Sequence, residues 1–599
     1  MRIALVSTPW PLFNRPSIQL GSLKAFLSER LPEVKVDALH LYLLVAAALG
    51  YPLYEEISQS TWLAEPLYGA LLYPDRSELI EKAWTKRASR TRYCKGWGFK
   101  KICERLQAIS LEILERHDWF QYRLIGFSAC FSQLTSTLYF IRSIREMAPE
   151  VPVVVGGSSC AGDLGKALLN TFPDITYAIE GEGELPLLKL IQQIENSDLP
   201  NIQESGDSRF RDPEQIVRMD ELPTPNYDDY FQTLKGLGPS KKFHARIPVE
   251  MSRGCWWNRC AFCNLNLQWK GYRSKSSDKM ISEMISLSER YEVLGFSFMD
   301  NLLPQKNLDG FFRRITEFNR DFELFAEIRA TTPSTTLEAM GQAGMREIQV
   351  GIEALSTTLL KKINKGTTAM DNIEIMKNCE RPGFPALTGN LIMEFPGSDE
   401  KDVDETLRVL DFVRPFHPLK AIPFWLGYGS PVRSNQRYYG IKRSFNHPFY
   451  RSIFPQRTYQ SLLTMIQGYH GGVMHQKKLW KPVKAKVSKW AKEYAVLHQV
   501  PRSGPILSYM DGGDFMIIRE RRLGDHPMTH KLTGASRKIY LFCETQRSIQ
   551  EVTQHFPSIA ADKIESFLRM MVEKRLMFQE GGRYLSLAVP ARTKTISNS

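Results

Sequence analysis

Short apolar runs alternate with helical patterns along the first 195 residues, as expected for a parallel α/β sheet. The runs that predict strands lie at residues 3–6, 34–38, 124–128, 151–155 and 175–179. The first run is followed by Ile18–Leu27, whose apolar positions lie on one helical face. An aromatic-rich stretch, about residues 40–118, predicts a helical insertion. Because the later runs lead into Ser or Gly, and carboxyl strand ends form the ligand crevice of open sheets, we expect a ligand-binding α/β domain over 1–195.

A second β/α series follows a change in composition. Residues 196–246 are polar and contain several prolines, which predicts a linker between domains. Residues 247–430 again alternate strand and helix patterns, with strand candidates at Val249–Ser252, Gly295–Met299, Leu324–Arg329, Glu347–Ile352 and Gly389–Phe395. This order predicts a partial or full β/α barrel, whose chemistry lies at the carboxyl ends of its strands.

The last part of the chain predicts a connection and a small module. Residues 431–510 are expected to form a helical connecting segment, and 511–590 a separate unit. Phe515–Arg519 is typical of a strand, and the apolar residues between Ile564 and Val572 follow helical spacing. Residues 579–584 then predict a hairpin around two glycines. Helices followed by a hairpin are typical of a winged-helix-like α+β module.

Composition and charge narrow the class of protein. A chain of 599 residues exceeds one hydrophobic core, and 43% hydrophobic with 24% charged residues is typical of a soluble globular protein. No apolar run reaches membrane-spanning length and the start lacks a signal-peptide pattern, so we expect a cytoplasmic protein with no membrane partner. The net charge of +13 weakly suggests an anionic partner. Within 477–492, seven lysines alternate with apolar residues, which favours a solvated helix face over a surface for peptide or nucleic acid.

Three of the nine cysteines cluster, and they carry the clearest chemical signal. Cys255, Cys260 and Cys263 lie within nine residues directly after a predicted strand, whereas the other six are scattered, as buried thiols are. A zinc site normally needs four ligands, and no fourth Cys or His stands nearby. Three thiolates on a [4Fe–4S] cluster leave one iron open to a ligand. The pattern favours that cluster over a zinc site or a loop of buried thiols.

The cysteine loop resembles that of the radical S-adenosylmethionine (SAM) superfamily, which reads C-x3-C-x-aromatic-C. Phe262 occupies the aromatic position, and the first gap has four residues instead of three. Matching segments follow in the family's order, including Gly351-Ile352-Glu353 and Phe395-Pro396-Gly397. The resemblance implies SAM contacts at Phe262, Asp300, Asn301, Glu327, Arg329, Gly351 and Glu353.

The N-terminal domain resembles the cobalamin-binding domain of one radical SAM class. The resemblance implies cobalamin contacts at Ser17, Gln19, Leu20, Ser128, Gly156, Gly157, Ser158, Gly181, Glu182 and Gly183. Small residues let the backbone approach the corrin closely. The sequence has no D-x-H-x-x-G, so we expect cobalamin without a protein histidine ligand. The implied fold class is α/β: a Rossmann-like cobalamin-binding domain plus a radical SAM partial (β/α) barrel, with the winged-helix-like module.

Nearly the whole chain is similar to radical SAM C-methyltransferases that mature ribosomally made peptides. The similarity rests on Gly254-Cys255-Trp256-Trp257, Tyr272–Ser276, Lys362–Gly366 and Tyr584–Ala588. It implies methylation of an unactivated carbon of a precursor peptide through a 5′-deoxyadenosyl radical and methylcobalamin. The module at 511–590 is similar to the peptide-recognition domains of such pathways, and a purely structural winged-helix cap is the alternative. No residue beyond the cluster cysteines is assigned a catalytic role.

Partners and alternatives follow from the same resemblance. We expect a precursor peptide between the two large domains, partly held by a free edge of the strand at 515–519, and a one-electron reductant such as flavodoxin or ferredoxin. A cobalamin-dependent enzyme acting on a small natural-product precursor shares every cofactor motif and is the first alternative. A methylthiotransferase acting on RNA needs a second cluster, and the dispersed N-terminal cysteines argue against it, so nucleic acid is not an expected partner.

Overall fold

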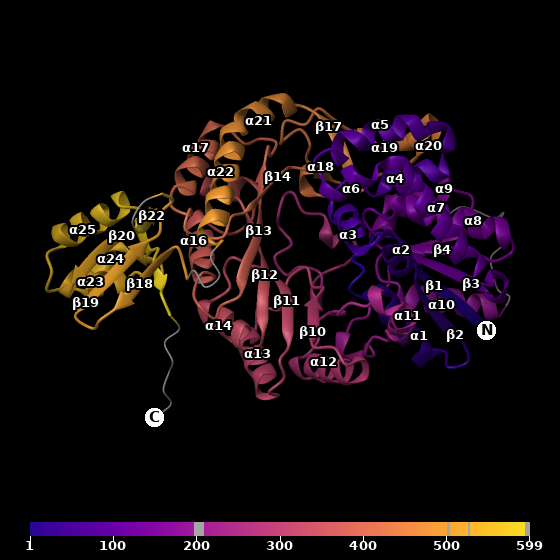
Figure 1. Cartoon of the computed structure of the whole chain (residues 1–599), viewed down its shortest axis with the longest axis horizontal. Coiled ribbons are helices and arrows are strands. Elements are labelled where there is room, and N and C mark those ends of the chain that lie inside the picture. The colour runs from indigo at the N-terminus through magenta and orange to yellow at the C-terminus, as the bar shows by residue number, and fades with distance from the viewer. Residues whose placement is uncertain (197–208, 500–503, 525–526, 593–599) are drawn as a thin grey trace.

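A computed structural model describes residues 1–196, 209–499, 504–524 and 527–592. The N-terminal sheet, the barrel and the C-terminal module follow one another along the longest axis of the molecule (Figure 1). No helix of these described ranges is both long and apolar enough to cross a membrane.

The N-terminal domain is a parallel six-stranded sheet in the order β2-β1-β3-β4-β5-β6. Its first five strands, which the apolar runs predicted, are β1 (Arg2–Ser7), β2 (Lys35–His40), β3 (Leu124–Ser128), β4 (Val153–Gly156) and β5 (Tyr177–Ile179). Alternate side chains of β1 face opposite ways, so Ile3 and Leu5 pack with α1 (Ile18–Arg30) and α10 (Glu184–Glu195). Ala4 and Val6 pack with the helical insertion on the other face. The doubly wound α/β domain is therefore confirmed.

The insertion consists of helices that cover that second face. They are α2 (Leu41–Leu49), α3 (Tyr51–Gln59), α4 (Glu65–Leu72), α5 (Ser77–Ala88), α6 (Arg92–Trp97) and α7 (Phe99–Glu115). The domain's remaining helices are α8 (Leu134–Met147) and α9 (Asp163–Thr171).

The segment predicted as a linker has ordered structure in its described part, 209–246. β6 (Phe210–Arg211) adds a sixth parallel strand to the sheet, and α11 (Asp228–Gly236) packs beside β2. The Asp229 carboxylate accepts hydrogen bonds from the Lys24 ammonium and the Ala38 backbone N–H. Tyr227 is fully buried. The polar composition of this segment predicted a linker, because a carboxylate that pairs with another domain cannot be distinguished in the sequence from one that is exposed to solvent.

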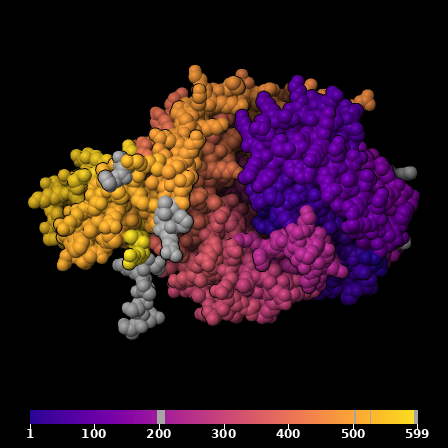
Figure 2. Space-filling view, in the orientation of Figure 1, coloured from indigo at the N-terminus to yellow at the C-terminus, as the bar shows by residue number. Residues whose placement is uncertain are grey.

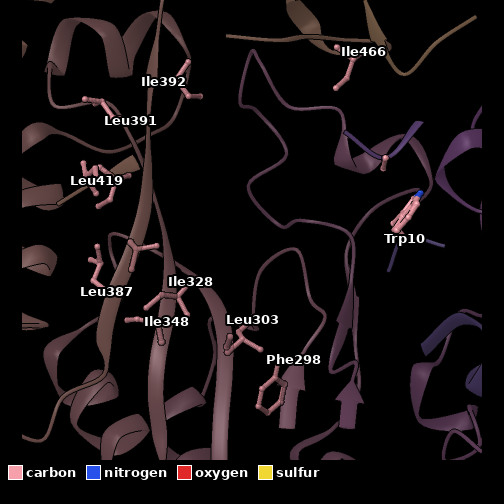
Figure 3. Packing of buried hydrophobic residues seen from close by; sticks show 14 of the residues in the cluster. Trp10, Phe298, Leu303, Ile328, Ile348, Leu387, Leu391, Ile392, Leu419 and Ile466 are labelled. Carbon is pink, nitrogen blue, oxygen red and sulfur yellow. The ribbon is translucent and has the colours of Figure 1, made fainter. Parts of the chain in front are cut away.

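The middle of the chain forms a partial barrel of six parallel strands in the order β7-β10-β11-β12-β13-β14, with both edges open. The strands are β7 (Ile247–Val249), β10 (Gly295–Phe298), β11 (Glu323–Arg329), β12 (Met345–Glu353), β13 (Ala386–Met393) and β14 (Lys420–Pro423). The helices are α12 (Ser277–Tyr291), α13 (Leu308–Glu317), α14 (Ser334–Gln342), α15 (Thr357–Lys362), α16 (Ala369–Asn378) and α17 (Glu400–Leu410). Buried Ile328, Ile348 and Leu387 pack between neighbouring strands (Figure 3). Of the two predicted possibilities, a partial or a full barrel, the structure has the partial barrel.

The connecting segment is not purely helical, which corrects the prediction for 431–510. Its helices are α18 (Pro431–Ser434), α19 (Pro448–Ile453), α20 (Gln456–Ser461), α21 (Val473–Leu479) and α22 (Lys481–Leu497). Two strands lie between these helices, β16 (Arg443–Asn446) and β17 (Ile466–His470). With β15 (Leu426–Gly427), which lies just before the segment, they form an antiparallel sheet in the order β15-β17-β16. These strands are too short to show a period of two in the sequence. The segment runs from the barrel to the N-terminal domain along one edge of the molecule (Figure 1).

The C-terminal module combines three helices with two small sheets. The helices are α23 (Gly534–Phe542), α24 (Ile549–His555) and α25 (Ala561–Glu573), and the hairpin of β22 (Met577–Glu580) and β23 (Arg583–Ser586) follows them, as a winged-helix-like module requires. The second sheet has the order β20-β19-β18-β24, where β24 is Val589–Pro590. β19 (Phe515–Glu520) lies between β18 (Leu507–Asp511) and β20 (Met528–Thr533), so its predicted free edge is wrong.

The close packing of α1 against Tyr227, in the segment that precedes α11, gives a test of this fold. A Cβ on Gly21 would lie 2.3 Å from Cε1 of Tyr227. The ring cannot retreat, because its hydroxyl donates to the Pro248 carbonyl at 2.7 Å. We expect Gly21→Ala to lower the free energy of unfolding by about 1–3 kcal/mol, as overpacking does. Urea unfolding followed by tryptophan fluorescence measures it. Exposed Ser28→Ala on the same helix is the control, and equal stability of the two variants would contradict the packing.

Candidate active site

The three clustered cysteines lie on a loop at the carboxyl end of β7. The loop joins β8 (Ser252–Arg253) to β9 (Arg273–Ser274), which pair antiparallel. It begins at Gly254, whose φ of +87° and whose distance of 2.3 Å from an added Cβ to the Gly271 carbonyl oxygen both require glycine. All three thiols are partly exposed. The barrel therefore presents them where its chemistry is expected.

Burial and nearby cations act in opposite directions on the clustered thiols. Burial raises the pKa of Cys260 and raises that of Cys263 to about 11, while the positive charge of Lys365 acts in the opposite direction on both. Negative charge on Cys255 raises both values further, so the three thiols interact. Among the described residues, no three His, Cys, Asp or Glu side chains stand in a geometry that could hold a metal ion. The fit to an iron–sulfur cluster therefore rests on three soft donors beside cations.

Two cations border the cysteine loop. The Arg329 guanidinium lies 4.5 Å from the ring centroid of Trp257, and it donates to the Lys365 carbonyl at 2.5 Å. The Lys365 ammonium pairs with the Glu353 carboxylate at 3.1 Å and lies 5.8 Å from the Phe262 ring centroid. The Arg329 Nε is buried with no hydrogen-bond partner among the described residues. A buried donor without an acceptor indicates room for an anionic ligand group.

Carboxylates line the same side of the partial barrel. Glu327 and Arg329 are two residues apart on β11, and Gly351 and Glu353 are two apart on β12, so each pair shares a face. Burial, reinforced by Glu353, raises the pKa of Glu327 to about 7. A Cβ on Gly351 would lie 2.6 Å from the Lys365 Nζ, so glycine leaves room for that ammonium. The predicted SAM residues on β11 and β12 thus meet in one place.

The predicted pair after β10 has a different position. Asp300 is buried, and its carboxylate accepts hydrogen bonds from Ser252 Oγ at 2.6 Å and from the Met251 N–H at 3.1 Å. Burial raises the pKa of this carboxyl to about 7. Asp300 therefore positions the start of the cysteine loop. The adjoining Asn301 side chain has a buried Nδ2 with no hydrogen-bond partner among the described residues.

Sequence reasoning did not assign Lys365 a role in the site. The residue follows α15 in a turn where Gly366 has φ +72° and an added Cβ would meet the Trp257 ring at 2.1 Å. Trp257 also donates from Nε1 to the Asn364 carbonyl at 2.9 Å. The only signal in the sequence was the resemblance of the segment 362–366, which does not show that the lysine faces the thiols.

A large cavity lies between the N-terminal domain and the barrel. Its empty volume is about 1120 Å³, space open to solvent included. Eight of the ten predicted cobalamin contacts line it: Gln19, Leu20, Ser128, Gly156, Gly157, Gly181, Glu182 and Gly183. The other two do not. Ser17 caps α1, accepting from the Leu20 N–H at 3.4 Å, and Ser158 begins a short 3-10 helix.

The barrel wall of this cavity was missed by the sequence analysis. It consists of Glu250, Arg253, Gln268, Trp269 and Met299. All five lie within or beside the cysteine loop or at the end of β10. Nothing in their local pattern shows that they face another domain, because the contact is formed only when the two sheets pack together.

A buried ionic cluster joins the two walls. Arg253 donates to Glu182 at 2.8 Å and to Glu184 at 2.7 Å from the N-terminal domain, and to Glu250 at 2.8 Å from the barrel. The Arg253, Glu182 and Glu184 side chains are at most 7% exposed. Burial alone raises the pKa of Glu184, but the charge and hydrogen bond of Arg253 outweigh it and the pKa is lowered. Both carboxylates come from the turn after β5, so the ion cluster ties that turn to the cysteine loop.

Comparison with known proteins identifies the central domain. Residues 249–410 match the family model of the Radical SAM superfamily, and the chain therefore contains a radical SAM domain. An uncharacterized methyltransferase from Pyrococcus horikoshii is 28% identical over 300 residues, which cover 48% of this chain and 63% of that protein. The chain spans less than two thirds of the length of such curated relatives.

Two solved structures are similar in fold to most of the chain. The cobalamin-dependent SAM radical enzyme OxsB, with aqua-cobalamin and SAM bound, gives a TM-score of 0.55 at 14% identity, covering 84% of this chain and 69% of its own. The radical SAM methyltransferase TsrM from Kitasatospora setae, with tryptophan and a SAM analogue bound, gives 0.52 at 16% identity, covering 82% and 88%. At these identities the likeness shows a common fold.

The ion cluster at Arg253 predicts a large effect of one substitution. Arg253→Met leaves the buried Glu184 carboxylate without its ion-pair partner and leaves Glu182 with Arg273 alone, so we expect a loss of about 3–5 kcal/mol in the free energy of unfolding. Urea unfolding of the full chain at neutral pH is the measurement. Arg116→Met, which breaks an exposed pair with Glu112 on α7, should change it by less than about 1 kcal/mol. Equal effects of the two substitutions would show that the buried cluster does not hold the domains together.

Proposed function

We propose that the protein is a cobalamin-dependent radical SAM methyltransferase that C-methylates an unactivated carbon of a ribosomally made precursor peptide. One observation carries this proposal: the large cavity of the N-terminal domain has the cysteine loop of the radical SAM domain as part of its opposite wall. A methyl donor in the cavity and a radical source at the loop would then act on one substrate. The class is supported by OxsB, which binds aqua-cobalamin and SAM, and by TsrM, which binds cobalamin and a [4Fe–4S] cluster.

The cavity suits a corrinoid. Glycines at the ends of β4 and β5 leave the backbone open to a flat ligand, and a Cβ on Gly156 would have no atom closer than 3.9 Å. Apolar Leu5, Val154 and Ile179 line the wall beneath. No histidine is among the described lining residues. This lining supports a corrinoid held without imidazole.

The charged groups beside the cysteine loop suit the methionyl part of SAM. The Glu327 and Glu353 carboxylates can accept from an ammonium, and Arg329 has a free donor for a carboxylate. Phe262 and Trp256 supply apolar surface for an adenine. When bound, the cluster, SAM and cobalamin supply one-electron cleavage and methyl transfer; the protein's own residues orient them and exclude water. A further cavity of about 850 Å³ beside Trp256 and Arg329 leaves space at this end of the barrel.

The cysteines of the N-terminal domain argue against the methylthiotransferase alternative. Cys94, Cys103 and Cys160 are buried, and Cys130 is half-buried. They belong to separate elements: Cys94 to α6, Cys103 to α7, Cys130 to the turn after β3, and Cys160 to a short 3-10 helix after β4. They therefore do not form a compact ligand loop like the one at 255–263.

The cluster assignment makes a direct prediction. Anaerobic reconstitution of the full chain should give about four irons per chain, held by the three loop cysteines. Replacing Cys255, Cys260 and Cys263 together with Ala should abolish iron binding and SAM cleavage. The matched variant with Ala at Cys94, Cys103, Cys130 and Cys160 should keep its iron. A cluster that survives the first set of changes, or is lost in the second, refutes the assignment.

The corrinoid assignment is tested by filling the cavity. Gly156→Leu places a side chain in the open space without a backbone clash, so the protein should fold but bind hydroxocobalamin at least about tenfold more weakly, a loss of about 1.4 kcal/mol. The absorbance of retained corrinoid after desalting is the measurement. Gly96→Leu adds the same group at an open surface glycine on α6 and is the control. Equal corrinoid retention by both variants would place the cofactor elsewhere.

A further inference from the structure

The positive charge of the protein comes from one segment, residues 412–492, which we name the basic strap. The strap contains fifteen Lys and Arg residues and no Asp or Glu. The rest of the chain has 63 basic and 65 acidic residues, so without the strap the net charge is slightly negative. The lysine-rich helix face singled out in the sequence is thus only part of a longer basic surface. In Figure 2 the strap runs in orange along the upper edge, from above the barrel to the N-terminal domain.

Most of these cations have no ion-pair partner. Arg414, Lys486 and Lys489 pair with Asp411 or Glu493, the two acidic residues that flank the strap. The other twelve form no ion pair with any described carboxylate. Those that are exposed include Arg437, Lys442, Arg443, Arg451, Arg457, Lys477, Lys478, Lys481, Lys484 and Lys492. Unpaired charges of one sign repel each other and attract an anionic partner.

Five of the cations gather at one corner of the strap, which we name the basic corner: Arg437, Lys442, Arg443, Lys477 and Lys478. Arg443 on β16 is paired in register with His470 on β17, and the Lys442 N–H donates to the His470 carbonyl at 2.8 Å. An added Cβ on Gly471 would lie 2.2 Å from the Gly440 carbonyl oxygen, so the turn into α21 lies against the chain beside β16. The lysines of α21 follow within that helix.

The strap that carries the basic corner borders the active site. Beside the corner, the Tyr439 ring packs 5.7 Å from that of Phe395, two residues after the end of β13. The Val432 N–H on α18 donates to the Ala261 carbonyl at 2.9 Å, between two cluster cysteines. Asn264 of the cysteine loop donates to the Tyr428 carbonyl at 3.2 Å, and the Tyr428 hydroxyl donates to Asp163 of the N-terminal domain at 2.8 Å. The strap therefore contacts both the cysteine loop and the N-terminal domain.

The surface of the corner favours a peptide as its partner. Tyr438 is 83% exposed and Met474 is 76% exposed, so apolar groups stand among the cations. β16 is the outer strand of its sheet and pairs on one side only, with β17. An extended peptide can use such an edge for main-chain hydrogen bonds, while its acidic side chains meet the cations. A nucleic acid could use the charge but not the strand edge.

We propose that the basic corner binds an acidic segment of the peptide substrate and so delivers a remote part of the chain to the site. This inference rests on the proposed function, and it names the substrate class as a peptide with an acidic stretch. Contacts far from the reacting carbon supply binding energy that holds that carbon in place. Because the contacts are charged and exposed, they should weaken as salt screens them.

The test measures binding alone, on the full chain and without turnover. The probe is a short fluorescent peptide in which glutamate alternates with leucine and serine, read by anisotropy at several salt concentrations. The variant carries Arg437→Glu, Lys442→Glu, Arg443→Glu, Lys477→Glu and Lys478→Glu. We expect at least about a tenfold weaker affinity, equivalent to about 1.4 kcal/mol. Equal urea unfolding of the variant and the wild type checks that the fold is intact.

The control variant reverses the charge of four exposed lysines outside the strap that pair with none of the described carboxylates. Its substitutions are Lys35→Glu, Lys95→Glu, Lys100→Glu and Lys235→Glu. It should bind the glutamate peptide as the wild type does, and a lysine peptide of the same pattern should bind neither protein. Unchanged binding by the corner variant, or the same loss in the control, overturns the proposal. So does a single-stranded RNA that binds more tightly than the peptide and depends on the same five residues. Because no cluster or corrinoid is needed, these results are independent of the tests of the methyltransferase assignment.

Discussion

The architecture of the site depends on one buried guanidinium. Arg253 is paired with carboxylates from two domains, and none of these groups can be left alone without a large desolvation cost. The arginine stands two residues before Cys255, and two of its partners stand in the turn that follows β5. A movement of the N-terminal sheet away from the barrel would therefore expose or unpair charges at the base of the cysteine loop. The ion pairs of Arg253 therefore fix the turn after β5, which lines the cavity, relative to the cysteine loop.

Other polar contacts also hold the ends of the cysteine loop in place. Asp300 holds Ser252 and the Met251 backbone, so the end of β10 positions the start of the loop. Arg273, at the far end of the loop, pairs with Glu182 and also donates to the Ile216 carbonyl. The loop is thus held at both ends by buried or half-buried charges, while its middle, with the thiols, stays accessible. Such an arrangement leaves the loop able to take up a ligand without reorganising the domains around it.

The sequence predicted what is periodic or local, and missed what depends on packing. The strands of both large sheets were found because buried runs such as β3 and β12 are apolar along their length. The glycines of the cavity were found because close backbone approach needs glycine at strand ends. Lys365 and the barrel wall of the cavity were missed, since two distant segments must meet before either has a role. β19 was predicted with a free edge because its neighbours, β18 and β20, are short and mixed in polarity.

The basic strap shows how function can oppose stability within one fold. Twelve cations that pair with none of the described carboxylates repel one another. A chain optimised for folding alone would intersperse acids among them, as the rest of this sequence does. The strap nevertheless has a firm apolar base: Trp480, Val483 and Trp490 are buried against the barrel, and Trp490 donates to the Phe416 carbonyl at 3.1 Å. That base offsets the repulsion and keeps the charges on the outer surface. A surface maintained at such a cost, next to a site that must hold a flexible substrate still, is best explained by the charge of what it binds.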